Sequence, residues 1–153
     1  KKARAEQLPE KVKGKRTDQK LLKGLRVLVV DDNRLNQKVA TKFLDKWAVS
    51  HQTADNGVEA LSILERETFD LILLDLQMPI MDGFETVKHL RESKNAVWRK
   101  LPVVALTSSS SRYDKEKARQ AGFNDYLSKP FQPEQLKKVI RHYALRKSSY
   151  REI

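Results

Sequence analysis

The stretch Leu71-Ile-Leu-Leu-Asp75 is a short, unbroken apolar run that stops at an acidic residue. A second, similar run, Leu25-Arg-Val-Leu-Val-Val30, stops at the acidic pair Asp31-Asp32. A strand that is apolar at consecutive positions, rather than at alternate ones, is buried on both faces. These two runs therefore predict the central strands of a parallel sheet that carries helices on each side.

The rest of the chain continues this alternation. Further strands are predicted at 49–54, 101–106 and 123–127, and apolar side chains recur at helical spacing in the segments between and after the strands. Five strands thus alternate with five helices. The pattern predicts an α/β fold of the flavodoxin-like (βα)5 type, a three-layer sandwich with a parallel five-stranded sheet of order 2-1-3-4-5.

Two residue pairs mark helix starts. Asn56 is followed three positions later by Glu59, and Ser111 is followed by Asp114, so each pair can cap a helix. The helix after Ser111 is unusual, because small residues such as Ala118 make up most of its expected inner face. We therefore expect this helix to be packed more weakly than the others.

Charge is unevenly distributed along the 153 residues. The net charge is +11, and residues 1–26 hold ten Lys/Arg against three Asp/Glu. We interpret residues 1–22 as a basic linker from an upstream domain, 23–147 as the folded domain and 148–153 as a C-terminal tail. An arm that touches nucleic acid or anionic lipid is the alternative for the linker, but no aromatic platform or recognition-helix pattern supports a nucleic-acid-binding module.

Composition excludes other classes of protein. The chain has no cysteine, which rules out disulfide and thiolate chemistry. No apolar run approaches the roughly 20 residues of a membrane-spanning helix, and the N-terminus lacks a secretory pattern. The first residue is Lys, so we expect a piece of a longer protein, and a cytoplasmic location fits these features.

Polar residues stand where the predicted strands end: Asp31 and Asp32 after the first, Asp75 after the third, Thr107 after the fourth and Lys129 after the fifth. In a parallel sheet these ends share one edge, where ligands bind. Gathered carboxylates repel one another unless a cation intervenes, and Mg2+ prefers oxygen ligands. The pattern therefore predicts a magnesium site.

Such a site suits phosphoryl transfer. Asp75 can attack phosphorus to give an acyl phosphate, while Mg2+ and Lys129 neutralise the transferring group and Thr107 donates its hydroxyl. An aspartate-nucleophile phosphatase would use similar groups, but it places an acid/base Asp two residues after the nucleophile, where this chain has Gln77. A flavin-binding fold is disfavoured because no phosphate-cradling loop follows the first strand.

Four motifs in this order resemble those of response regulator receiver domains. They are Val29-Val-Asp-Asp-Asn33 with Asn36, Leu73-Leu-Asp-Leu-Gln-Met-Pro79 running on to Met81-Asp-Gly83, Thr107, and Asp125-Tyr-Leu-Ser-Lys-Pro130. The resemblance covers about residues 24–147, which is nearly everything outside the basic linker.

The resemblance implies specific roles. Asp75 would be the phosphorylation site, and Mg2+ would be bound by Asp32, by Asp75 and by the backbone carbonyl of Gln77, with Asp31 acting through water. Lys129 would contact the phosphoryl group.

A conformational switch is implied as well. Thr107 and Tyr126 would move together on phosphorylation, and Ser108 stands where the family commonly has a small residue such as Ala. The resemblance also implies that the peptide bond between Lys129 and Pro130 is cis.

Within the family, the short motifs Asp-Asp-Asn and Asp-Leu-Gln-Met-Pro are similar to those of receiver modules in hybrid sensor histidine kinases. The expected partners are then a histidine kinase, or the chain's own kinase core, and a histidine phosphotransfer protein. A stand-alone response regulator is the alternative.

Overall fold

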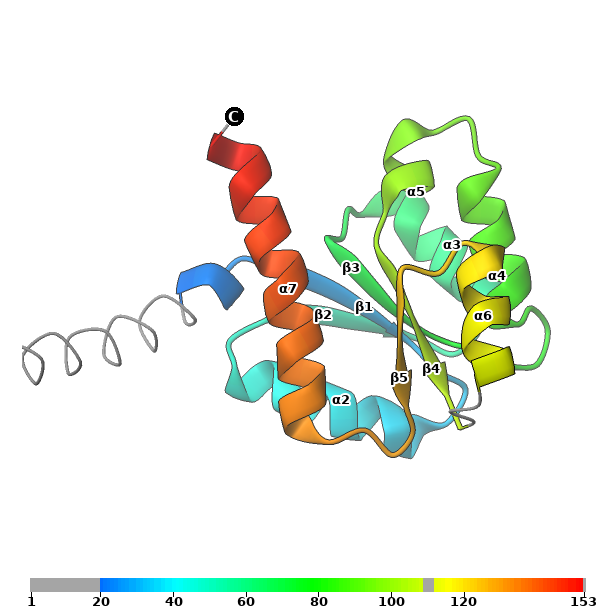
Figure 1. Cartoon of the computed structure of the whole chain (residues 1–153), viewed down its shortest axis with the longest axis horizontal. Coiled ribbons are helices and arrows are strands. Elements are labelled where there is room, and N and C mark those ends of the chain that lie inside the picture. The colour runs from blue at the N-terminus through cyan, green and yellow to red at the C-terminus, as the bar shows by residue number, and fades with distance from the viewer. Residues whose placement is uncertain (1–19, 109–111, 153) are drawn as a thin grey trace, which may run out of the picture.

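The computed structural model describes residues 20–108 and 112–152, with side chains described as far as Lys147. Its centre is one parallel sheet in the order β2-β1-β3-β4-β5 (Figure 1), which confirms the predicted strand order. The strands are β1 (Arg26–Val30), β2 (Ser50–Ala54), β3 (Leu71–Asp75), β4 (Val103–Thr107) and β5 (Asp125–Ser128).

Helices cover both faces of the sheet, as predicted (Figure 1). One face is covered by α2 (Arg34–Lys46) and α7 (Pro133–Glu152), and the other by α3 (Gly57–Arg66), α4 (Gly83–Arg91) and α6 (Arg112–Ala121). Among the described residues, no helix combines the length and the apolar character that crossing a bilayer requires.

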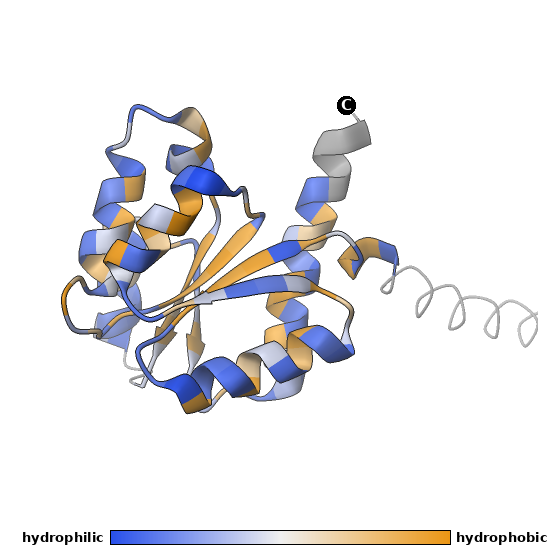
Figure 2. Ribbon diagram, turned by 180° about the vertical axis from the view of Figure 1, so that it is seen from behind, coloured by the Kyte–Doolittle hydropathy of each residue, from blue (hydrophilic) through white to orange (hydrophobic). Residues whose placement is uncertain are grey.

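The core consists of two apolar layers, one on each side of the sheet, and the central strands between them are mainly orange in Figure 2, whereas the edge strand β2 is mainly blue to white. Alternate residues of one strand enter opposite layers: Leu71 and Leu73 face α2 and α7, whereas Ile72 and Leu74 face α3 and α4. Every residue of β3 and β4 is buried, while the edge strand β2 is mostly not. Consecutive apolar residues therefore marked the central strands because both faces are covered.

Side-chain caps fix where several helices begin. The side chain of Asn33 starts α2 by accepting hydrogen bonds from Leu35 N and Asn36 N. Asn56 starts α3 by accepting from Glu59 N at 2.9 Å, so the predicted capping position is confirmed. The predicted cap at Ser111 lies outside the described residues.

The structure differs from the sequence prediction in one element. A short helix, α5 (Ala96–Lys100), precedes β4 and was not predicted. It buries no residue, and Asn95 caps it through Val97 N and Trp98 N. Apolar periodicity could not reveal α5, because periodicity reports a buried face.

The two ends of the domain also differ from the expected boundaries. Leu22, which we assigned to the basic linker, is buried in the core, and Leu21 packs against that core. The last helix continues to Glu152, so residues 148–152 are not a separate tail. Residues 1–19 of the predicted linker lie outside the described residues.

Candidate functional site

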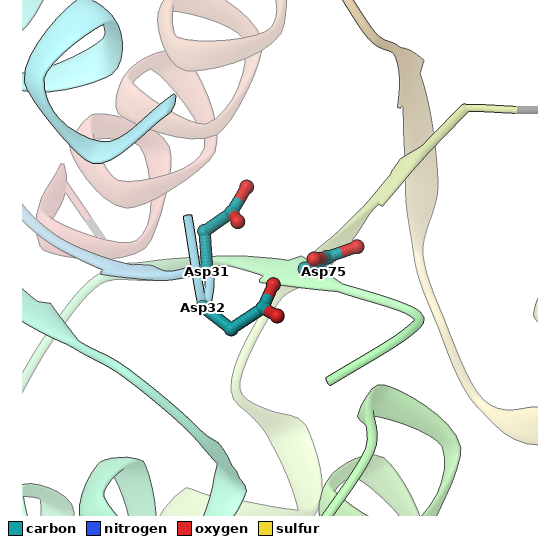
Figure 3. Close-up of side chains that lie close together, drawn as sticks. All are labelled: Asp31, Asp32 and Asp75. Carbon is teal, nitrogen blue, oxygen red and sulfur yellow. The ribbon is translucent and has the colours of Figure 1, made fainter. Parts of the chain in front are cut away.

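Three carboxylates meet at the carboxyl edge of the sheet. Val30 of β1 pairs in register with Leu74 of β3, so the residues that follow them, Asp31 and Asp75, arrive side by side. Carboxylate oxygens of Asp31, Asp32 and Asp75 lie within 4.8 Å of one another (Figure 3). Asp31 is fully buried and Asp75 is 4% exposed, whereas Asp32 is exposed. The sequence prediction that these side chains share a pocket is consistent with this geometry.

One lysine partly balances this charge. Lys129 follows β5, and its Nζ lies 3.1 Å from Oδ1 of Asp75 and 3.5 Å from Oδ2 of Asp31. Its backbone N–H donates to the carbonyl of Thr107 at 2.7 Å, which ties the loop after β5 to the end of β4. The peptide bond between Lys129 and Pro130 is cis. Lys129 alone is paired with two of these three carboxylates, so the cluster keeps excess negative charge.

Burial and repulsion act together on Asp75. Burial, followed by the negative charge of Asp31, raises the pKa of Asp75 from an ordinary value of 3.8 to about 6. The ammonium of Lys129 and a 3.3 Å hydrogen bond from Gln77 N oppose this rise only in part. The carboxylate of Asp75 is therefore held in a place that favours either a proton or an additional cation.

The side chain of Asp31 shows the same shortage of positive charge. Its Oδ1 accepts a hydrogen bond from Asn33 N at 2.9 Å. Its Oδ2 is buried and faces the ammonium of Lys129 at 3.5 Å, but within the described part of the chain it accepts no hydrogen bond. A buried carboxylate oxygen without a donor is unfavourable unless a cation or an ordered water completes its environment.

The carboxylates open into a cleft of about 320 Å³. The predicted residues Thr107 and Ser108 line this cleft beside Gln77 and Lys129. Asn33, Asn36, Phe84, Asp114 and Lys117 also line it, although the sequence analysis assigned them no site role. The positions of Asp114 and Lys117 near the start of α6 were visible in the sequence, but their direction depends on how that helix is rotated.

Tyr126 stands apart from the cleft. Its side chain is on β5, 37% exposed, with Nζ of Lys115 lying 4.5 Å from its ring centroid. It borders a separate hollow between α6 and β5, which also contains Arg119 and Phe123. The structure thus brings together all the predicted site residues except Tyr126.

Comparison with known proteins identifies the family whose fold and acidic cleft this chain shares. Residues 27–141 match the family described as the response regulator receiver domain. The chain belongs to this family of two-component signalling domains.

Individual relatives from this family are similar to the chain in sequence and in structure. Hybrid signal transduction histidine kinase K of Dictyostelium discoideum is 42% identical over 121 residues, which are 76% of this chain and 10% of that kinase. The Saccharomyces cerevisiae Ssk1 receiver domain, solved as a co-crystal with the histidine phosphotransfer protein Ypd1, superposes with a TM-score of 0.75 at 35% identity, covering 82% of this chain and 92% of that one. The chain therefore spans a small part of the full-length kinase that it matches.

A further solved relative contains a metal ion. The receiver domain of sensor histidine kinase PA1611 from Pseudomonas aeruginosa superposes with a TM-score of 0.72 at 33% identity, covering 79% of this chain and 98% of that one. That structure is described as having a magnesium ion coordinated in its active site cleft.

Proposed function

We propose that this domain accepts a phosphoryl group on Asp75 in a Mg2+-dependent phosphorelay. The observation that carries the proposal is the cluster of Asp31, Asp32 and Asp75 with Lys129 Nζ 3.1 Å from the acceptor carboxylate. Asp75 lines an open cleft, so a phosphodonor can reach its carboxylate.

The donor set fits Mg2+. Asp32, Asp75 and the backbone carbonyl of Gln77 would hold the ion, with Asp31 acting through water, and all these groups are hard oxygen donors. The raised pKa of Asp75 and the buried Asp31 oxygen that lacks a hydrogen bond both support a cation here. Bound there, the ion would supply positive charge against the phosphoryl oxygens.

The transfer itself uses groups of this chain. A carboxylate oxygen of Asp75 forms a bond to phosphorus while the phosphorus–nitrogen bond of a phosphohistidine breaks, and the imidazole leaves with that electron pair. The ammonium of Lys129 stabilises charge on the transferring group. The product is an aspartyl phosphate whose oxygens can accept a hydrogen bond from the hydroxyl of Thr107.

The side chain two positions beyond Asp75 distinguishes this proposal from a phosphatase. An aspartate-nucleophile phosphatase needs an acid/base carboxylate there, whereas this chain has Gln77, whose amide cannot take up a proton at neutral pH. We therefore expect the aspartyl phosphate to persist long enough to act as a signal.

We further propose that Thr107 and Tyr126 form the switch. The bond from Thr107 to a phosphoryl oxygen exists only after transfer, so it supplies the differential contact that shifts a conformational equilibrium. Tyr126 is half-exposed in this structure and contacts Lys115 of α6, so its inward movement would break that contact and reposition α6.

The proposed partners follow from the relatives and from the surface. A histidine kinase, or a kinase core in the same cytoplasmic chain, would supply the phosphoryl group, and a histidine phosphotransfer protein would exchange it. Leu35 and Ile80 are 69% and 78% exposed, and they belong to the segments after β1 and β3 that also supply Asn36 and Gln77 to the cleft, so both offer apolar side chains to a partner. A stand-alone response regulator remains the alternative context.

A direct experiment tests the proposal. The purified domain is incubated with acetyl phosphate and Mg2+, and the intact mass is followed with time. We expect one phosphoryl adduct that is absent without Mg2+ and absent in Asp75→Asn. The control variant Asp45→Asn, an exposed acid near His51, should be labelled like the wild type. Labelling of Asp75→Asn, or rapid multiple turnover of phosphomonoesters, would refute the assignment.

A further inference from the structure

Gln37 is a buried polar residue close to the acidic cluster that the proposed chemistry does not use. It lies in the second turn of α2, with its side chain directed at the ends of β1 and β2. Its Nε2, which carries two hydrogens, donates to the carbonyl of Asp31 at 2.6 Å and to Oδ1 of Asp55 at 2.8 Å, and it shares one of these hydrogens with the carbonyl of Ala54 at 3.2 Å. One amide group therefore joins α2 to the ends of two neighbouring strands.

These bonds fix the backbone where the acidic pair begins. Asp31 N donates to the carbonyl of Ala54 at 3.1 Å, and Oδ1 of Asp31 accepts from Asn33 N at 2.9 Å. The bond from Gln37 to the carbonyl of Asp31 constrains the peptide unit that leads into Asp32. The amide, the carbonyl and the side chain of Asp31 are thus all held, and Gln37 holds the carbonyl.

Asp32 depends on this backbone for its position. Its side chain is exposed, yet one of its carboxylate oxygens lies within 4.8 Å of those of Asp31 and Asp75. A carboxylate on a short side chain can remain near Asp31 and Asp75 only if its Cα is placed correctly. Any freedom of the peptide between Asp31 and Asp32 would therefore move a cation ligand directly.

We propose that Gln37 is a positioning residue for the divalent-cation site, which sets the affinity for Mg2+ by fixing the backbone that carries Asp31 and Asp32. This inference rests on the proposed function. Gln37 is neutral and reaches the carbonyl of Asp31, not its carboxylate, so it acts on geometry and adds no charge to the pocket. Groups that hydrogen-bond the metal ligands themselves typically change metal affinity by about 10- to 100-fold when removed, and Gln37 acts one bond further out, through the backbone.

The test compares Gln37→Leu, which keeps a similar volume but has no donor, with Lys38→Ala, an exposed neighbour on the same helix. Mg2+ is titrated into each protein in a calorimeter without phosphodonor. We expect the dissociation constant of Gln37→Leu to rise about 10-fold or more, and that of Lys38→Ala to stay within about twofold of the wild type. Gln37→Met is a second donorless variant if the leucine is not tolerated.

Two further measurements separate positioning from a general loss of stability. At saturating Mg2+, the maximal rate of labelling by acetyl phosphate should return to within about threefold of the wild type, because Asp75 and Lys129 are unchanged. In the metal-free protein, the amide of Asn33 should exchange its hydrogen faster in the variant. A folded variant with a lower unfolding midpoint but an unchanged dissociation constant would overturn the inference. Failure of the wild type itself to bind Mg2+ would instead defeat the proposed function.

Discussion

Two helices, α4 and α6, lie on the same face of the sheet (Figure 1). Both border the cleft, but they differ in how many residues they bury. The buried residues of α4 are Gly83, Thr86, Val87 and Leu90. In the described residues of α6, only Ala118 is buried. Because local stability follows buried contacts, the cleft has one fixed wall and one that is weakly held. A phosphorylation signal should therefore be transmitted through α6.

Both ends of α4 are fixed by specific contacts. At its start, a side chain at Gly83 would collide with the backbone of Asp75 and Leu76, so the helix packs directly against the end of β3. At its end, the guanidinium of Arg91 donates to the carbonyls of Trp98, Arg99, Leu101 and Gly122 and to the side chain of Asn124. These five acceptors join α4 to α5, to the start of β4 and to the loop before β5.

Truncating one buried side chain in each helix gives the largest contrast. Leu90→Ala removes a fully buried side chain and should lower the free energy of unfolding by about 3 kcal/mol through lost burial and a cavity. Ala118→Gly leaves little space and should cost about 1 kcal/mol, mainly through helix propensity. Equilibrium urea unfolding measures both, and equal costs would show that α6 is as firmly packed as α4.

Removing the Arg91 contacts comes next. Arg91→Met keeps an apolar stem but leaves several carbonyls without their donor, so the free energy of unfolding should fall by about 2 kcal/mol. Lys88→Met, an exposed change on the same helix, should stay within about 0.5 kcal/mol of the wild type. If Arg91→Met matches this control, water replaces the guanidinium at no cost and α4 is fixed by its apolar residues alone.

The sequence was sufficient for the sheet and for most of the site. Strands buried on both faces leave consecutive apolar residues, and parallel strands bring their carboxyl ends to one edge, so Asp31, Asp75 and Lys129 could be placed together without coordinates. The weak packing of α6 was also predictable, because Ala118 stood where other helices have leucine.

Long polar side chains that act across elements could not be predicted. Gln37 bonds to Ala54 and Asp55, which lie 17 and 18 positions further along the chain. Arg91 bonds to Asn124, which lies 33 positions further along. Lys117 reaches the cleft only because of the rotation of α6, and there its Nζ lies 4.9 Å from the ring centroid of Phe84. Periodicity tells which face of a helix is apolar, but it does not tell where a long polar side chain ends.

The ionised carboxylate of Asp75, at the end of β3 on the α4 side of the cleft, lowers the stability of the folded protein. Because burial and Asp31 raise its pKa to about 6, the folded protein binds a proton more tightly than the unfolded chain does. The free energy of unfolding should therefore fall as the pH rises from about 4 to about 6 without Mg2+. Asp75→Asn removes this decrease and should be more stable than the wild type by about 1–2 kcal/mol at pH 7, with solvent in the cleft limiting the gain.

The measurement is urea unfolding of both proteins in EDTA at a series of pH values. The difference between them reports the Asp75 carboxylate together with its interactions with Asp31 and Lys129. Saturating Mg2+ should stabilise the wild type and remove much of its disadvantage, since binding to the folded state alone adds stability. A difference that does not change with pH would mean that burial and Asp31 do not raise the pKa of Asp75 in the folded protein.

The smallest expected effect concerns the surface contacts of α6. Arg119 pairs with Glu116 one turn earlier, both side chains are exposed, and the hydrogen bond lowers the pKa of Glu116. Lys115, one turn before Arg119, contacts the ring of Tyr126. Because salt screens exposed charges, 1 M NaCl should raise amide hydrogen exchange in α6 by about twofold and leave α4 unchanged. Arg119→Ala should reproduce this increase at low salt and then show no further response to NaCl.

Equal salt sensitivity in α4 and α6 would mean that surface charge does not distinguish the two helices that border the cleft. The mobility of α6 would then depend on the weak packing at Ala118 alone.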